Sequence, residues 1–164
     1  MDEEQFTSFY LRTARPLWGY IARVSGDPTI ADDVLQESYC RYLCADLPVM
    51  NDSESKSYLF RIATNVMRDR WRQREDSMES PAEQASPTPD LESAVDMRNA
   101  LGELQPRERE LLWLAYVEGA NHEEIAQMTG LRATSIRTLL LRARHRLATL
   151  LQLRKHTENT PEER

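Results

Sequence analysis

The chain has 164 residues, 40% of them hydrophobic and 7% aromatic, which suits one domain or two small helical ones rather than a large α/β fold. Glycine occurs only 5 times, no strand runs into a Gly-rich turn, and no apolar run approaches the length of a membrane span. We therefore expect no phosphate-binding loop and no membrane insertion. The net charge of −6 at first argues against a partner as acidic as nucleic acid.

The distribution of charge says more than its sum. Residues 76–105 carry one basic and seven acidic side chains, a net charge of −6, whereas residues 106–155 carry nine and five, a net charge of +4. The basic charge is thus in the C-terminal half, as a nucleic-acid binder requires, while the acid predicts a second, protein partner. The acidic N-terminus does not resemble a secretory signal, and a chain with two cysteines fits the reducing cytoplasm.

The first half predicts three helices. Apolar residues recur at helical spacing over residues 6–24, where Pro16 is expected to kink or divide the helix. A second helix over residues 28–45 is capped by Asp27, with Pro28 in its first position. A third helix over residues 54–75 follows a loop, with Asp52 or Ser53 as its cap.

The second predicted helix has a polar face made by Asp33, Gln36, Glu37, Cys40 and Cys44. Its ordinary interpretation is a solvated surface. The two cysteines, four residues apart, are a weaker hypothesis for a metal or redox pair, and with no second Cys or His cluster we expect no metal site.

The third predicted helix ends in an arginine-rich segment that surrounds Trp71. Two interpretations fit it equally well. Cations at a helix C-terminus are favoured by the helix dipole, and arginine with aromatic residues also suits single-stranded nucleic acid. The arginines are Arg68, Arg70, Arg72 and Arg74.

Residues 76–90 form an acidic linker with three prolines and three serines, and helices resume near residue 91 and at Pro106. The predicted fold is therefore all-α, with two small helical domains joined by an acidic flexible linker. Their bounds are 1–75 and 91–152, and residues 153–164 form a polar tail.

Residues 121–151 predict a helix-turn-helix. Asn121 and Glu124 form a capping box, and Gly130 ends the first helix. On the second helix, apolar residues repeat on one face: Ile136, Leu140, Ala143, Leu147 and Leu150. The opposite face is basic and carries hydroxyl groups: Thr134, Arg137, Thr138, Leu141, Arg142 and His145. This pattern is typical of a DNA reader, and the alternative is a helical hairpin with a solvated basic face.

Three groups of motifs, in order along the chain, resemble those of the extracytoplasmic-function (ECF) group of bacterial RNA polymerase sigma factors. The first is ADDVLQE at residues 31–37, and the second is YLFRIATN at residues 58–65. The third combines LQPRER at 104–109, EEIA at 123–126 and LRAR at 141–144. Together they cover roughly residues 5–152.

The resemblance implies a role for each half. The acidic helix docks on core RNA polymerase, and the expected contacts are Asp33, Gln36 and Glu37. The first half also holds a base flipped from the melted non-template strand of the minus-10 element, through Val49, Met50, Asn51, Arg61, Asn65, Arg68 and Arg72. The second half reads duplex minus-35 DNA through Thr134, Ser135, Arg137, Thr138, Leu141, Arg142 and Arg144.

The chain also departs from the family pattern. Residues 49–52 read VMND where the family often has an aromatic residue and a glycine, and Thr134 and Leu139 replace a glycine and a basic residue. The promoter sequence is therefore not predicted by analogy. Sigma factors of this group are commonly held inactive by an anti-sigma factor, which is a further candidate partner.

Two other functions compete with this one. A stand-alone helix-turn-helix regulator would bind duplex DNA tightly without polymerase. An enzyme would need a nucleophile–base pair, a metal-ligand cluster or a phosphate loop, and the sequence has none of these, so we expect no catalysis and no cofactor.

Overall fold

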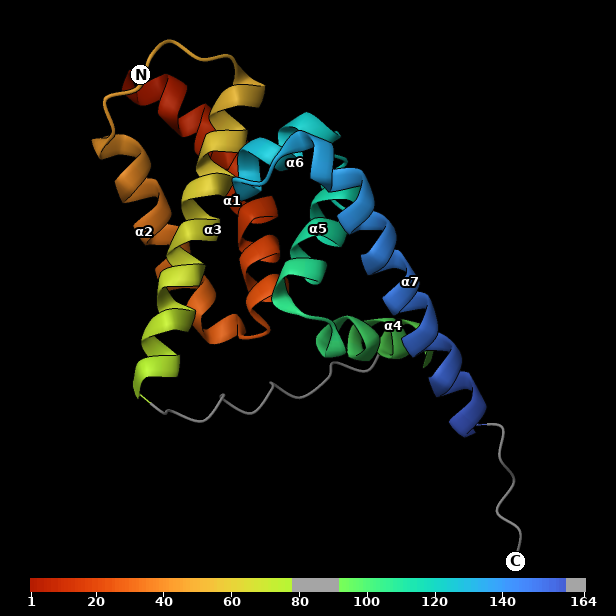
Figure 1. The fold of residues 1–164 in the computed structure, drawn as a ribbon. Helices are drawn as coiled ribbons and strands as arrows, with labels where there is room; N and C mark the ends of the chain where they lie inside the picture. Colours follow the sequence, from red (N-terminus) through yellow and green to blue (C-terminus); the bar gives the residue numbers. More distant parts are fainter. Residues whose placement is uncertain (78–91, 159–164) are drawn as a thin grey trace, which may run out of the picture.

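The computed structural model describes residues 1–77 and 92–158, so most of the predicted linker and the end of the tail lie outside the described residues. Within them the chain is all-α, as predicted. The elements in order are α1 (Glu3–Ser25), the 3₁₀ turn η1 (Pro28–Ile30), α2 (Ala31–Cys44), α3 (Asp52–Ser77), α4 (Glu92–Glu103), α5 (Pro106–Tyr116), α6 (His122–Thr129) and α7 (Ala133–Glu158) (Figure 1).

Helix α1 runs without a break through Pro16, so the expected division of this helix is wrong. It begins at Asp2, whose side chain accepts a hydrogen bond from the backbone of Gln5, and it ends at Gly26 in the left-handed conformation. Phe9 before the proline and Leu17 after it are both buried. Packing on both sides of Pro16 outweighs the one backbone hydrogen bond that proline removes.

The cap of α3 is Asn51, not Asp52 or Ser53 as predicted. The backbone N–H of Glu54 donates to the Asn51 side chain at 2.9 Å, and the N–H of Asn51 donates to the Glu54 carboxylate at 2.9 Å. This reciprocal arrangement needs an acidic residue three positions after the cap, and only Asn51 has one.

Two helices extend beyond their predicted ends. Helix α3 continues to Ser77, and α7 continues to Glu158, past the expected start of a polar tail at residue 153. Arg154 in this part of α7 pairs with Glu103 at the end of α4. This ion pair joins the end of α7 to the end of α4.

The first half is built around aromatic packing between α1, α2 and α3. Tyr20 and Phe60 are fully buried with ring centroids 5.2 Å apart, and Phe9 stacks on Tyr42 at 5.2 Å. The Tyr39 hydroxyl and Thr13 share a buried hydrogen bond of 2.6 Å. These contacts fix the angle between α1 and α2, and so the position of the acidic helix.

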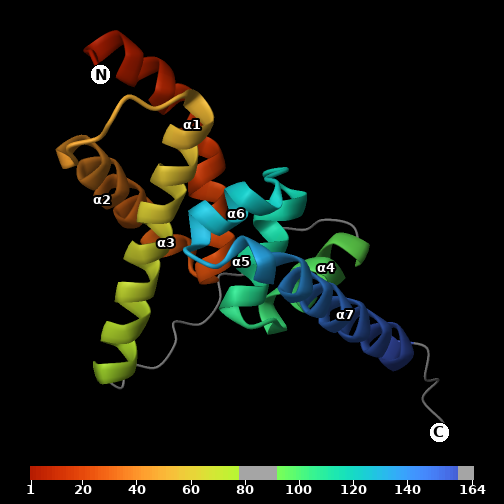
Figure 2. The ribbon, with the colours of Figure 1, turned by 45° about the horizontal axis from the view of Figure 1, so that its top comes forward.

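The two halves pack against each other instead of standing apart. Helix α5 contacts α1, and α6 contacts α3, and their buried apolar residues form one continuous core. Gly19 of α1 lies close to the ring of Trp113 of α5. Helices α2 and α7 are on opposite sides of this body in both views (Figures 1 and 2).

Candidate nucleic-acid and protein interfaces

The helix-turn-helix predicted from the sequence is present in α6 and α7. Asn121 and Glu124 form the expected capping box, and Gly130 ends α6 with a φ of 75°. Ile136, Leu140 and Ala143 of α7 are buried against α6 and the rest of the second half. The predicted apolar face therefore holds α7 in place and turns its other face outward.

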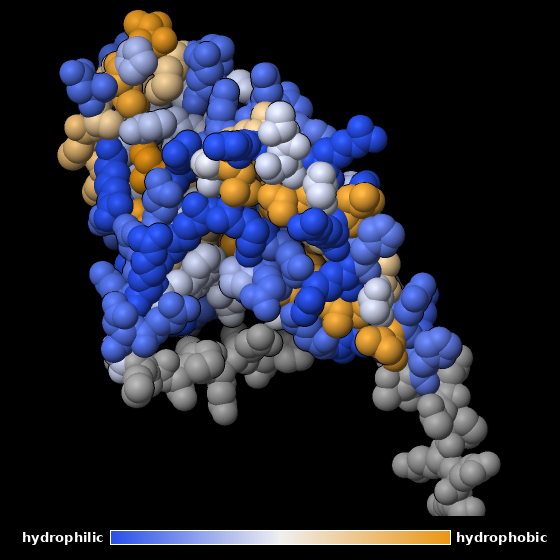
Figure 3. Space-filling model, viewed as in Figure 1, coloured by the Kyte–Doolittle hydropathy of each residue, from blue (hydrophilic) through white to orange (hydrophobic). Residues whose placement is uncertain are grey.

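That outward face carries most of the residues predicted to read the minus-35 element. Thr134, Arg137, Thr138, Leu141, Arg142 and Arg144 are exposed, and Ser135 is half-buried. Leu141 is 47% exposed, so its side chain is accessible for an apolar contact such as one with a thymine methyl. Along α7, Figure 3 shows such hydrophobic residues scattered among hydrophilic ones.

Tyr116 lies beside this face and was not predicted from the sequence. It is 61% exposed at the end of α5, and its hydroxyl accepts a hydrogen bond of 3.0 Å from Arg144. The spacing of apolar residues in α5 predicted its core residues, but it did not single out an exposed tyrosine. Its proximity to α7 depends on the tertiary fold.

The polar face of α2 is open, as the docking prediction requires. Asp33 and Gln36 are exposed, while Glu37 is half-buried and pairs with Arg41 at 2.7 Å. Cys40 and Cys44 on the same face are exposed free thiols. Across the described residues no group of three or more His, Cys, Asp or Glu side chains is placed to hold a metal ion.

The residues predicted to hold the minus-10 strand do not form one open surface. Val49 is fully exposed in the loop before α3, Met50 is half-buried, and Asn51 is used as the helix cap. Asn65 and Arg72 are exposed on α3.

Two arginines of the same set face the second half. Arg61 donates to the backbone carbonyl of Gln127 at 3.4 Å, and Arg68 donates to the carbonyl of Thr129 at 3.1 Å. Both carbonyls lie at the C-terminal end of α6. Phe60, an aromatic residue of the arginine-rich helix, is fully buried and cannot stack on a base in this arrangement.

A buried carboxylate lies where the halves meet. The side chain of Glu110 in α5 is 3% exposed, Arg68 of α3 lies 3.3 Å from it, and Arg107 lies 4.0 Å from it. Burial raises the pKa of Glu110, and the two arginines oppose this shift. No sequence pattern predicted this cluster, because Glu110 lies in an ordinary run of alternating charges.

Tyr20 completes the buried cluster from α1. Its hydroxyl shares a hydrogen bond of 2.8 Å with Thr64 of α3. Burial, and then the negative charge of Glu110, raise the pKa of Tyr20. Side chains from both halves thus share one buried polar network.

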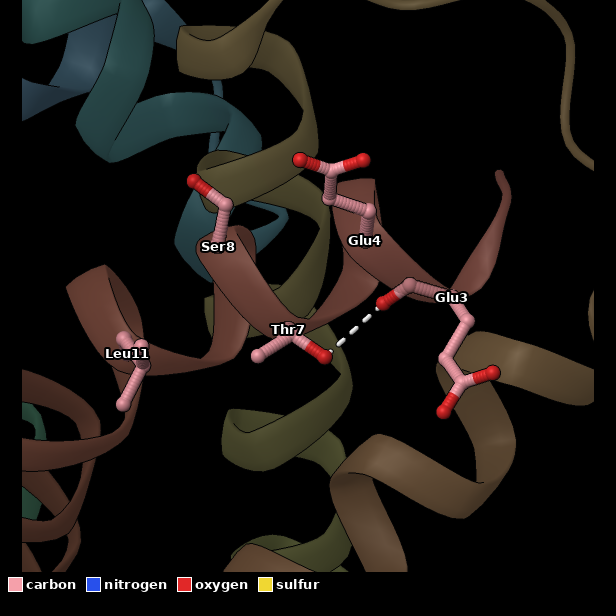
Figure 4. Close-up of a pocket in the computed structure, with 5 residues that line it drawn as sticks. All are labelled: Glu3, Glu4, Thr7, Ser8 and Leu11. Carbon is pink, nitrogen blue, oxygen red and sulfur yellow. Dashed lines mark hydrogen bonds between the residues drawn. The ribbon is translucent and has the colours of Figure 1, made fainter.

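Hollows on the described surface include one at the start of α1 and one between α1, α3 and α6. One hollow, at the start of α1, is lined by five residues of that helix alone, and Figure 4 shows Thr7 hydrogen-bonded back to the carbonyl of Glu3. Leu11, at its edge, is 74% exposed. None of the described helices combines the length and apolar character needed to cross a membrane.

Comparison with known proteins gives the two halves distinct counterparts. The family model "Sigma-70 region 2" matches residues 9–76, and "Sigma-70, region 4" matches residues 94–147. The ECF RNA polymerase sigma factor EcfG of Rhodopseudomonas palustris is 30% identical over 142 residues, which are 82% of this chain and 78% of the relative. The chain belongs to the ECF RNA polymerase sigma factors. The resemblance inferred from the motifs is confirmed.

Other relatives agree. The sigma factor CarQ of Myxococcus xanthus is 28% identical over 91% of this chain and 90% of its own length. The match to the ECF sigma factor SigE of Mycolicibacterium smegmatis is 29% identical and spans 57% of that relative, little more than half of its length. The family consists of transcription initiation factors, which favours initiation over a stand-alone regulator.

Solved structures share the fold. The sigma factor RpoE of Bartonella quintana, in complex with the anti-sigma factor NepR, aligns with a TM-score of 0.73 at 24% identity, covering 91% of this chain and 98% of RpoE. CnrH, in complex with the cytosolic domain of CnrY, aligns with a TM-score of 0.67 at 26% identity, covering 93% of this chain and 90% of CnrH.

Proposed function

We propose that this ECF sigma factor binds core RNA polymerase, directs it to promoters with specific minus-10 and minus-35 elements, and assists strand separation. The observation that carries the proposal is the pairing of a region 2 match with a region 4 match in one chain, each containing an exposed face of the expected chemistry. Polymerase and promoter DNA share the cytoplasm, where we expect the chain to act.

Polymerase docking is assigned to the open face of α2, through Asp33, Gln36 and Glu37. The assignment is supported by the exposure of the first two side chains. It gives the acidic surface a protein partner, which DNA binding alone leaves unexplained. With α7 on the opposite side of the molecule, docking through α2 leaves the DNA reader accessible.

Promoter recognition is divided between the two halves. The exposed face of α7 is assigned to duplex minus-35 DNA, where arginine can pair with guanine and Leu141 can contact a thymine methyl. Strand holding is assigned to the loop before α3 and to Asn65, Arg61, Arg68 and Arg72 on α3. Flipping a base costs a few kcal/mol, which these contacts must offset.

The test is transcription of fragmented host DNA by core polymerase, with and without this protein, followed by mapping of RNA 5′ ends. New start sites that share two upstream elements are the expected result, and they supply the promoter sequence. Absence of new starts, together with no co-elution with core polymerase, would overturn the proposal. Tight duplex binding without polymerase would then favour the stand-alone regulator.

An anti-sigma factor is the further partner we propose, because the sigma factor RpoE, which shares this fold, was solved in complex with the anti-sigma factor NepR. A protein of this kind should compete with core polymerase for the chain. The check is a competition pull-down with a candidate encoded by the same host, in which excess core polymerase releases the bound candidate.

A further inference from the structure

We propose that Arg23, Arg98 and Arg109 form a binding site for a small phosphate-bearing anion where α1, α4 and α5 meet. The site goes beyond the proposed function, because none of these arginines is among the residues assigned to polymerase or to promoter DNA. Two observations carry it. Three cations converge at one place, and two buried N–H groups beside them have no acceptor among the described residues.

The contacts of Arg109 bring the three arginines together. Its Nη1 donates to the carbonyl oxygen of Gly102 at 3.3 Å, and the same atom lies 3.6 Å from the position of a Cβ added to Gly26. Gly102 follows Arg98 by four residues in α4, and Gly26 follows Arg23 by three residues at the end of α1. Residues at these spacings are neighbours on a helix surface. Arg23 and Arg98 therefore approach Arg109 from two different helices, whose ends meet the start of α5 in Figure 1.

The electrostatics of the three arginines are those of a cluster without a counter-charge. Burial is the only cause that lowers the pKa of Arg109. Burial, and then the positive charge of Arg98, lower the pKa of Arg23. All three remain protonated at neutral pH, because the ordinary pKa of arginine is far above 7. An anion that enters between like charges relieves their repulsion, so its binding is favoured.

Neighbouring acidic side chains have other partners. Asp27, which follows Gly26, pairs with Arg74 of α3 at 3.0 Å. Glu103 at the end of α4 pairs with Arg154 of α7. Neither carboxylate is free to neutralise the cluster, and so the balancing charge has to come from a ligand.

Two buried N–H groups of α5 add donors to the site. Nε of Arg109 and Nε1 of Trp113, one turn later, are both buried without an acceptor in the part of the chain that the structure describes. A Cβ added to Gly19 of α1 would lie 3.8 Å from Cζ2 of Trp113, the ring carbon beside the edge that carries Nε1. That edge therefore faces α1, where Arg23 lies one turn after Gly19. Unpaired buried donors cost free energy, and phosphate oxygens would supply the missing acceptors.

The shape of the junction favours a compact anion over an acidic peptide. Helices α1 and α5 pack directly on each other, which leaves no room for a length of chain between them. Arg98 and Arg109 are half-buried and Arg23 is exposed, so the approach is from the Arg23 side. A guanidinium group can donate two parallel hydrogen bonds to a phosphate group. The ligand is therefore free phosphate or the phosphate chain of a nucleotide.

The test is isothermal titration calorimetry of the full chain at constant ionic strength. The titrants are inorganic phosphate, pyrophosphate, ATP and GTP, with adenosine as the ligand that lacks phosphate. We expect saturable binding of the phosphate-bearing titrants and no binding of adenosine. Equal affinities for all four would identify free phosphate as sufficient, whereas nucleotides that bind more than about tenfold tighter than inorganic phosphate would identify a phosphate chain as the ligand.

Arg23→Gln and Arg98→Gln should each weaken this binding at least about tenfold, because each removes one charge-assisted hydrogen bond. Arg15→Gln is the matched control. Arg15 is an exposed arginine of α1 two turns before Arg23, and its replacement changes the net charge by the same amount. Circular dichroism shows whether each variant is folded, and two variants on different helices keep the test independent of the stability of either one.

The absence of saturable binding to the wild-type chain overturns the proposal. Equal weakening by Arg15→Gln also overturns it, because net charge would then explain the effect. Failure of the proposed function would look different. The chain would then not start transcription with core polymerase, while its phosphate binding and the loss of that binding in Arg23→Gln would remain.

Discussion

The guanidinium of Arg144 in the middle of α7 donates a hydrogen bond of 3.0 Å to the hydroxyl of Tyr116 at the end of α5. The contact joins the DNA-reading helix to the helix that precedes the helix-turn-helix. The hydrogen bond holds the Arg144 side chain, which is predicted to contact minus-35 DNA, in one orientation. It therefore reduces the conformational entropy that Arg144 loses on binding DNA.

Tyr116→Phe should therefore weaken binding of duplex minus-35 DNA by about 0.5–1.5 kcal/mol, the ordinary contribution of one hydrogen bond. Stability should change little, because Tyr116 is 61% exposed. Fluorescence anisotropy with a minus-35 duplex and thermal unfolding are the two measurements. Tyr10→Phe, an exposed tyrosine on α1, is the control, and equal binding by both variants would contradict the prediction.

Arg142→Ala should cost roughly 1–3 kcal/mol in minus-35 binding and relax the preference at one base position, if Arg142 reads a base. The control is Arg146→Ala, whose side chain pairs with Glu108 of α5 at 3.6 Å. Binding is measured against duplexes varied at each position. A loss of the same size for every sequence would instead identify Arg142 as a phosphate contact.

Alkylation of Cys40 and Cys44 should block polymerase binding. Both thiols are exposed on the face of α2 that carries Asp33 and Gln36, so a maleimide should label both in the folded protein. The added bulk should prevent docking, as measured by co-elution with core polymerase. The Cys40→Ser, Cys44→Ser double variant should bind polymerase with or without the reagent. If the labelled wild type still co-elutes, the docking face lies elsewhere.

Stability should fall in acid through Asp27. A hydrogen bond from Thr29 is the largest cause that lowers the pKa of this carboxyl, and Arg74 at 3.0 Å adds to it, while burial opposes both. A lowered pKa in the folded state means that ionised Asp27 makes its full contribution to the free energy of unfolding above the ordinary pKa of about 4. This contribution is lost as the pH falls below that value.

Asp27→Asn should accordingly lower the free energy of unfolding by about 1 kcal/mol at neutral pH and by less in acid. Asp52→Asn is the control, because the Asp52 side chain is 86% exposed and its pair with Arg12 should contribute little. Denaturant unfolding at several pH values makes the comparison. A loss independent of pH would show that the charge of Asp27 is not responsible.

Gly130→Ala should cost more stability than Gly119→Ala. Both glycines have positive φ, at 75° and 66°, so each alanine pays for the left-handed conformation by about 1–2 kcal/mol. Only at Gly130 does the added Cβ approach another side chain, the Arg61 guanidinium at 3.2 Å. The excess loss of stability should disappear when Arg61 is replaced by alanine. Denaturant unfolding of Gly130→Ala and Gly119→Ala, each with and without Arg61→Ala, measures this difference. An excess that persists would mean that Arg61 does not rest against the α6 turn.

The sequence by itself determined the elements and their chemistry. The capping box at Asn121, the stop at Gly130 and the apolar repeat on α7 are local signals, because caps and helical periodicity depend on neighbours within a few residues. The order of the motifs was enough to predict the family. Local signals led to wrong predictions at two places. At Pro16 tertiary packing sustains the helix, and at Asn51 the reciprocal hydrogen bonding with Glu54 determines the helix cap.

Only the tertiary structure decided what the side chains face. Arg61 and Arg68 look like free cations in the sequence, and the fold places the carbonyl end of α6 and the buried Glu110 against them. Tyr116 meets Arg144 for the same reason. Their partners lie 28 to 66 residues away in the chain, a separation over which no periodic pattern carries information. Contacts between distant segments are set by how the helices pack, and packing is a property of the whole chain.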